Sequence, residues 1–131
     1  MWPQDPMTRV FALLLVFQLK HFLADYVLQT TWMLGKGKDE WGFVGPLSAH
    51  CGVHALGTLA ITLTIDWRLS WLALADFVVH FTMDRAKAGP RYLGRFSDTS
   101  RHAFWNALGF DQMVHHVTHI AIIWWLAVPS A

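Results

Sequence analysis

Four apolar stretches, each close to the length of a membrane-crossing helix, constrain the fold of this chain more than any other feature. A hydrocarbon core about 30 Å thick needs about 20 mostly apolar residues in a helix. Segments at about 7–34, 46–65, 69–88 and 110–128 meet this requirement. Only 15% of the 131 residues are charged, whereas a soluble domain carries about 25%. We therefore expect an all-α fold, an integral membrane four-helix bundle that forms one domain over 1–131.

The connections between these segments differ in kind. Asp66-Trp67-Arg68 is short enough to join the second and third segments in a tight antiparallel hairpin. The stretch Thr99 to Gly109 is a candidate for a short interfacial helix before the last span. No basic n-region of a signal peptide precedes the first apolar run, and no motif like a signal-peptide cleavage site follows it. We therefore expect this run to be a retained membrane helix. Cys51 is the single cysteine, which excludes an intramolecular disulfide.

Basic residues are concentrated at one predicted face of the bundle. The first and third connections contain or adjoin Lys36, Lys38, Arg85, Lys87, Arg91, Arg95 and Arg101. The opposite face has only Arg9 and Arg68. The positive-inside rule then predicts a multi-pass protein with the basic face in the cytoplasm and both termini outside. Tryptophans at the two predicted interfaces are consistent with aromatic belts.

Each predicted span carries a pair of ionisable residues at i, i+4 spacing. The pairs are His21 and Asp25, His50 and His54, His80 and Asp84, and Asp111 and His115. Residues four apart lie on one face of a helix. Because the spans alternate in direction, all four pairs fall in one layer near the basic face. Charged groups inside spans are costly and usually functional, so these eight residues are our candidate site.

Imidazole and carboxylate together form a ligand set for zinc, manganese or iron. We expect all eight residues to be candidate ligands of one or two divalent ions, with zinc preferred. Asp25, Asp84 and Asp111 are also candidates for a catalytic base. A metal-free polar or proton-relay network is the alternative reading of the same pattern.

Several nearby residues extend this pattern. Gln29, Lys87 and Gln112 are candidates for substrate binding, although interhelical hydrogen bonds and the positive-inside rule explain them as well. His119 shares the face of His115 and is a further candidate ligand. Lys20 and Asp76 lie near the predicted midplane, and we predict that they form an ion pair there.

These motifs resemble a known family. The run His21-x-x-x-Asp25-x-x-x-Gln29 is similar to the signature of small bacterial and phage membrane proteins described as domain of unknown function 3307. The later His50, His80-x-x-x-Asp84-x-x-Lys87 and Asp111-Gln112-x-x-His115 look like that family's other motifs. The resemblance implies a bacterial inner-membrane protein and important positions, but no reaction. Inner-membrane metal-dependent hydrolases show a more distant likeness, which is an analogy of fold only.

Three functions remain open from the sequence. The first is a metal-dependent hydrolase acting on an anionic amphiphilic or phosphate-bearing substrate at the cytoplasmic face of the membrane. The second is a metal-ion or proton transporter, for which a homodimer would be needed to enclose a path. The third is an accessory membrane protein whose metal only stabilises the helices. The lipid bilayer is the expected partner in each case, and no nucleic-acid partner is expected.

Overall fold

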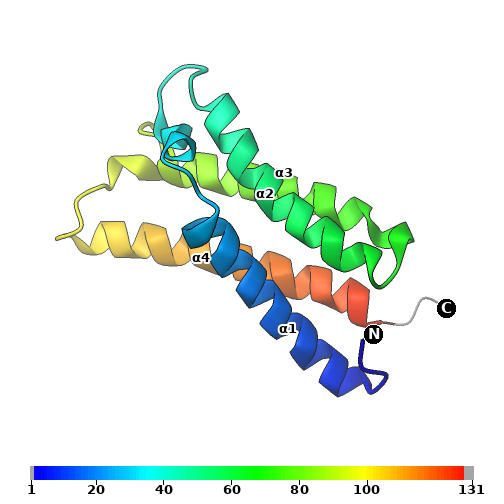
Figure 1. Cartoon of the computed structure of the whole chain (residues 1–131). Helices are drawn as coiled ribbons and strands as arrows, with labels where there is room; N and C mark the ends of the chain where they lie inside the picture. Colours follow the sequence, from blue (N-terminus) through cyan, green and yellow to red (C-terminus); the bar gives the residue numbers. More distant parts are fainter. Residues whose placement is uncertain (1, 129–131) are drawn as a thin grey trace.

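The computed structural model describes residues 2–128, and within this range all regular structure is helical (Figure 1). The four long helices are α1 (Pro6–Phe22), α2 (Val44–Leu63), α3 (Trp71–Ala88) and α4 (His102–Ala127). A π-helical turn, η1 (Leu23–Val27), continues α1, and three 3₁₀ turns lie in the connections: η2 (Trp32–Gly37), η3 (Trp67–Leu69) and η4 (Leu93–Arg95). The predicted all-α fold is confirmed.

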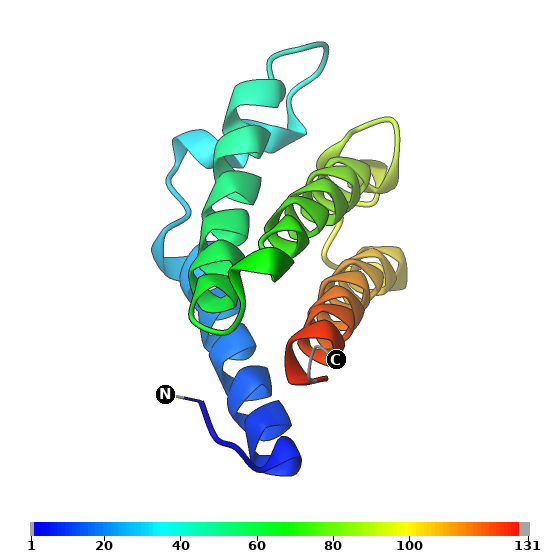
Figure 2. The ribbon, with the colours of Figure 1, turned by 90° about the vertical axis from the view of Figure 1, so that its right-hand side faces the viewer.

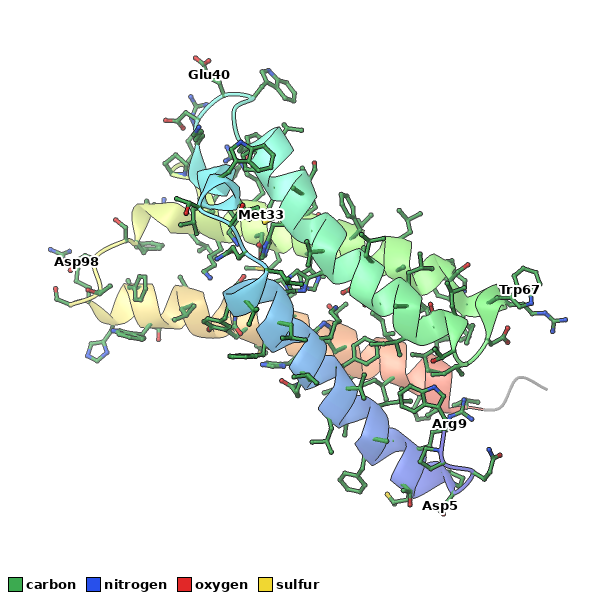
Figure 3. The ribbon with its side chains drawn as sticks, in the orientation of Figure 1. Asp5, Arg9, Met33, Glu40, Trp67 and Asp98 are labelled. Atoms are coloured by element: carbon green, nitrogen blue, oxygen red, sulfur yellow. The ribbon has the colours of Figure 1, made fainter. Side chains whose placement is uncertain are left out.

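The four long helices alternate in direction (Figures 1 and 2). α1 and α3 run toward the two long connections, and α2 and α4 run away from them. The start of the chain reaches the α2–α3 turn, where Trp2 Nε1 donates a hydrogen bond of 2.8 Å to Thr64 Oγ1. Figure 3 shows Asp5, Arg9 and Trp67 at this end, which we call the terminal end, and Glu40 and Asp98 at the opposite, loop end.

The first predicted segment, 7–34, is shorter in the structure. Asp5 caps the start of α1, since its side chain accepts a 2.7 Å hydrogen bond from Thr8 N. The helical path ends after Val27, and η2 begins only at Trp32. The hydroxyl of Thr30 accepts from Met33 N at 3.4 Å, so this side chain caps the new turn. The apolar residues after this break belong to η2 rather than to a continued span.

The predicted interfacial helix at 99–109 is not a separate element, which corrects our expectation. α4 is continuous over 26 residues from His102, and Gly109 does not interrupt it. Asp98 instead closes a turn before the helix, where its Oδ1 accepts from Ser100 N at 3.0 Å. The predicted last span, 110–128, is the second part of this longer helix, and Pro129, which follows it in the sequence, lies outside the described residues.

The interior changes character along the bundle. The apolar core lies toward the terminal end and consists of Leu13, Phe17, Ile61, Leu72, Ile122, Ile123 and Leu126. Toward the loop end, the buried side chains are mostly His, Asp, Lys and Thr. Among residues 2–128, one helical stretch, Pro6–Val27, is both long and apolar enough by composition to cross a membrane. The fold thus surrounds a polar interior at one end of the bundle, where the candidate site lies.

Candidate metal centre

Eight His and Asp side chains from the four long helices and η1 converge toward the loop end of the bundle. They are His21 and Asp25, His50 and His54, His80 and Asp84, and Asp111 and His115. We call this set the His/Asp layer. Asp25 is 21% exposed, and the other seven side chains are at most 7% exposed. The structure therefore brings together all eight residues that the i, i+4 pattern singled out.

Asp25 is the centre of the first half of the layer. Its Oδ1 lies 2.9 Å from His54 Nε2 and 3.4 Å from His50 Nε2. Its Oδ2 lies 3.1 Å from His21 Nε2. The π-helical turn η1 presents this carboxylate, and such turns often occur at functional sites. Three imidazoles from two helices therefore face a single carboxylate.

The second half of the layer is built on Asp84 and Asp111. His115 Nε2 lies 3.1 Å from Asp84 Oδ1 and 3.2 Å from Asp111 Oδ1. His50 Nε2 lies 3.1 Å from Asp84 Oδ2, and the same nitrogen contacts Asp25. Because His50 touches both halves, imidazoles and carboxylates alternate in one continuous network.

The donor atoms of this network have a spacing that fits a metal ion. Two groups each offer three donor atoms that all lie within 4.8 Å of one another: His21, Asp25 and His54, and Asp84, Asp111 and His115. Neighbouring ligands of a four-coordinate zinc, with bonds of about 2.0–2.1 Å, are about 3.3 Å apart. The contacts of 2.9 to 3.4 Å within the layer are close to this value. The residues present could therefore hold one or two divalent ions.

His80 makes polar contacts with Asp76, one helical turn before it, rather than with Asp84, the other member of its i, i+4 pair. Its Nδ1 turns back by one helical turn and lies 3.1 Å from the carbonyl oxygen and 3.0 Å from the Oδ1 of Asp76. The ring packs between His54 and His115, with a centroid distance of 4.1 Å to each. His80 thus connects the layer to a deeper group of polar side chains.

This deeper group consists of Lys20, Thr58, Asp76 and His119, and we call it the inner polar group. Lys20 Nζ lies 2.8 Å from Asp76 Oδ2, which confirms the predicted ion pair. Thr58 Oγ1 donates to the same oxygen at 2.6 Å, and His119 Nε2 lies 3.3 Å from Lys20 Nζ. Each of the four residues is less than 10% exposed. The ion pair therefore has the partners that a buried lysine and carboxylate require.

Two lysines contact the carboxylates of the second half of the layer. Lys36 Nζ lies 2.7 Å from Asp84 Oδ2, and Lys87 Nζ lies 3.0 Å from Asp111 Oδ2. His115 faces the Oδ1 atom of both carboxylates, so the lysines and this imidazole use different oxygens. Sequence reasoning included Lys87 but missed Lys36, which served there only as a loop charge for orientation.

Arg85 holds the segment that carries Lys36. Its Nη1 donates to the Lys38 carbonyl at 2.9 Å and to the Lys36 carbonyl at 3.4 Å. Its guanidinium also lies 3.7 Å from the centroid of the Phe43 ring. These contacts fasten η2 and the following loop to α3, so that the Lys36 ammonium reaches the buried carboxylate of Asp84.

A cavity of about 280 Å³ adjoins the layer. Its polar lining comprises Asp25, Gln29, Lys36, Asp84, Lys87, Asp111, Gln112 and His115. All three predicted substrate-binding residues, Gln29, Lys87 and Gln112, therefore line the same space. Gln112 also contacts the layer directly, since its Oε1 lies 3.4 Å from His21 Nε2. Carboxylates, an imidazole and two ammonium groups are thus available to one small molecule or headgroup.

The remaining His and Cys residues do not belong to the His/Asp layer or to the inner polar group. His116 Nδ1 lies 3.1 Å from Gln18 Nε2, which is an interhelical contact between α4 and α1. His102 is exposed at the start of α4. Cys51, the single cysteine of the sequence, is a fully buried free thiol next to His50 on α2.

Comparison with known proteins identifies one family. The family described as "Protein of unknown function (DUF3307)" matches residues 10–131, which is nearly the whole chain. The suspected family resemblance is therefore confirmed. No curated protein and no solved structure matches the chain.

Proposed function

We propose that this chain, which belongs to the DUF3307 family of proteins of unknown function, is a membrane-embedded, metal-dependent hydrolase. Its substrate would be an anionic amphiphile that carries a phosphate group. The observation that carries this proposal is the cavity beside the His/Asp layer. A set of metal-type donors and two lysines share its lining.

The polarity of the surface supports embedding in a membrane. Large apolar side chains on all four helices are strongly exposed, including Leu15 at 72%, Leu56 at 66%, Leu74 at 67% and Trp124 at 69%. A soluble protein rarely exposes contiguous apolar surface on this scale. α2 contains no Asp, Glu, Lys or Arg in 20 residues, and α4 contains only Asp111 in 26. We infer that all four helices cross the bilayer, with the site residues lowering the hydropathy of three of them.

Tryptophans at both ends of the bundle support the same arrangement. Trp67 and Trp125, toward the terminal end, are 70% and 54% exposed. Trp41 and Trp105, toward the loop end, are 84% and 57% exposed. Tryptophan is favoured at both interfaces of a bilayer. With the basic connections in the cytoplasm, the cavity would open toward the cytoplasmic headgroups and both termini would lie outside.

Different residues of the chain would have different roles at this site. Lys36 and Lys87 would bind the anionic group, and Gln29 and Gln112 would orient it by hydrogen bonds. Of the three carboxylates lining the cavity, one that is not committed to metal would act as a general base toward water. A bound divalent ion, zinc or alternatively manganese or iron, would supply Lewis-acid activation of the phosphate and of water.

Transport of a metal ion or of protons is the second candidate, and one observation favours it. The inner polar group extends the buried polar network from the layer toward the terminal end. Beyond it, however, Leu13 and Phe17 are fully buried in the apolar core. A path through one copy would have to cross this core, so transport requires a second copy or a large rearrangement.

Metal content tests the proposal directly. The full chain is purified in detergent without chelators, and bound metal is measured by inductively coupled plasma mass spectrometry. We expect one or two divalent ions per chain, and at least a tenfold loss in His21→Ala and Asp84→Ala. His102→Ala is the matched control because this histidine is exposed and lies outside the layer. Absence of stoichiometric metal in the wild type would refute the proposal.

Hydrolysis is then tested with vesicles that contain a phosphomonoester lipid such as phosphatidic acid. Release of inorganic phosphate by the metal-loaded wild type, and not by Asp84→Ala, is the expected result. Metal binding without hydrolysis of this lipid or of water-soluble phosphate esters would favour the accessory role. Uptake of the metal into proteoliposomes would favour transport.

A further inference from the structure

We propose that Asp76 is a positioning residue of the metal centre and holds His80 so that its Nε2 atom faces the ion. This inference rests on the metal centre proposed above. It gives the buried Lys20–Asp76 pair a role beyond the pairing of two charges. It also specifies which nitrogen of His80 is the ligand atom.

The surroundings of His80 determine which of its nitrogens carries the proton. Nδ1 makes a hydrogen bond of 3.1 Å with the Asp76 carbonyl oxygen, and it lies 3.0 Å from Asp76 Oδ1, which is a close polar contact rather than a hydrogen bond. Both atoms are acceptors, so an N–H at Nδ1 is favoured and a lone pair there would be repelled. In the neutral ring the lone pair therefore resides on Nε2. That atom is buried and has no hydrogen-bond partner among the described residues.

His80 is oriented in the reverse sense to its neighbours. In His21, His54 and His115 the Nε2 atom contacts an Asp of the layer, and the buried Nδ1 has no hydrogen-bond partner within residues 2–128. His80 has its Nδ1 satisfied and its Nε2 free. Metal-binding histidines usually donate the other ring N–H to a carboxylate or carbonyl, which fixes the orientation of the ring. His80 with Asp76 has this arrangement.

Lys20 and Thr58 hold Asp76 in its own position. Both contact Asp76 Oδ2, at 2.8 Å and 2.6 Å, which leaves Oδ1 to face His80. Asp76 is fully buried, and the Lys20 ammonium balances its charge. The two oxygens of this carboxylate therefore have different partners: Oδ2 contacts Lys20 and Thr58, and Oδ1 contacts the His80 imidazole.

The ligand atom of His80 also has suitable neighbours. Nitrogen atoms of His21, His80 and His119 all lie within 4.8 Å of one another, and the His80 ring packs against His54 and His115. The imidazoles of His21, His80 and His119 form a third group of possible metal donors, which lies on the side of the layer that faces the inner polar group. A purely structural ion pair would not need to orient an imidazole toward that position.

Metal affinity of designed variants tests the proposal in the full chain in detergent. In Asp76→Asn the amide oxygen would stay with Lys20 and Thr58, so its NH₂ would face His80 Nδ1 and oppose the N–H there. We expect zinc affinity, measured by competition with a chelating dye, to fall by about 10- to 100-fold. The double variant Lys20→Met/Asp76→Leu removes both charges together with the Oδ1 acceptor and should show a similar loss. Thr62→Val is the control: Thr62 is a buried threonine of the same helix as Thr58 whose hydroxyl donates to the Leu59 carbonyl, so zinc affinity should stay within about threefold of the wild type.

A second measurement does not depend on the variants folding. Nitrogen-15 NMR of histidine-labelled wild type, with the His80 signals assigned by their loss in His80→Gln, reports the protonated nitrogen. We expect Nδ1–H in the metal-free protein and a shift of the Nε2 signal when zinc binds. An Nε2–H ring, or zinc affinity unchanged in the folded double variant, would overturn the role of Asp76. Both results leave the metal centre intact, whereas a wild type without metal would refute the proposed function itself.

Discussion

The charges within the site control whether it favours a cation or an anion. Lys36 and Lys87 contact two of the three carboxylates of the layer at 2.7 Å and 3.0 Å. Replacing Lys36 by Met removes a positive charge close to the proposed metal position. We expect zinc affinity to rise and phosphate affinity to fall, each by about tenfold, because charges interact strongly in a partly buried site. Isothermal titration calorimetry with zinc, and with inorganic phosphate on the zinc-loaded protein, measures both changes.

Lys38→Met is the control for this experiment. Lys38 is exposed two residues further along the same connection, so it has the same charge without the contact to Asp84. Zinc and phosphate affinity should change by less than twofold in this variant. If Lys36→Met weakened zinc and phosphate together, Lys36 would instead support the shape of the site.

At the scale of residues, spacing predicted the site better than the partners within it. The i, i+4 pairs identified all eight members of the layer because antiparallel helices bring equal depths together. Spacing did not identify the polar partner of His80, because Asp76, His80 and Asp84 are spaced by four along one face of α3. The sequence offers His80 two equivalent carboxylates, and the choice of Asp76 depends on Lys20 and tertiary packing.

At the scale of elements, a glycine in α2 permits the close approach of α1. A Cβ atom at Gly57 would lie 2.8 Å from Lys20 Cγ, whereas nothing lies within 4 Å of such an atom at Gly52. We expect Gly57→Ala to lower stability by about 1–3 kcal/mol through overpacking. It should also displace Lys20 from Asp76. The apparent Tm in detergent, followed by circular dichroism, measures the loss of stability.

Gly52→Ala is the matched control because both glycines lie in the same helix. Alanine favours a helix over glycine by about 1 kcal/mol, so this variant should keep or raise the apparent Tm. The opposite order of the two variants would show that Lys20 does not pack against α2 as described.

Helix ends were harder to predict than helix existence. Hydropathy continued the first span to 34 because Trp32, Met33 and Leu34 are apolar. Thr30 caps a new turn there instead, a local hydrogen bond that hydropathy does not detect. The sequence H-F-x-x-D occurs twice, at His21 and at His80. The two copies make different side-chain contacts, because His21 contacts Asp25 whereas His80 contacts Asp76.

At the scale of the whole molecule, the loop end has polar residues in its interior and apolar residues on its surface, which is the reverse of the usual distribution in a soluble protein. His50, Asp84 and Asp111 are at most 5% exposed there, while Phe22, Val78 and Val117 are each more than 50% exposed. In a low-dielectric surrounding, these charged groups would require pairing with one another or with a metal. The proposed insertion of the whole bundle into a bilayer would account for both the buried polar residues and the exposed apolar ones.

Cysteine labelling tests this arrangement and the direction of insertion. In a Cys51→Ser background, single cysteines replace Gln4, Trp67 or Ser97, which are exposed and uncharged, so the Lys and Arg distribution stays intact. Trp67 lies at the terminal end, where Gln4 directly precedes Asp5 in the sequence, and Ser97 directly precedes Asp98 at the loop end (Figure 3). A membrane-impermeant maleimide applied to intact spheroplasts should label Gln4→Cys and Trp67→Cys. Ser97→Cys should react only after the membrane is permeabilised.

Trp67 distinguishes four crossings from one. If only the stretch Pro6–Val27 crossed the membrane, Gln4 would still lie outside, but Trp67 would remain with Ser97 on the inner side. Labelling of Ser97→Cys alone in intact spheroplasts would show the inverted orientation, and would place the cavity and its lysines on the outer face. The proposed substrate would have to reach Lys36 and Lys87 from the face on which the cavity opens. The result for Ser97 would therefore also decide in which compartment a phosphate-bearing substrate is to be sought.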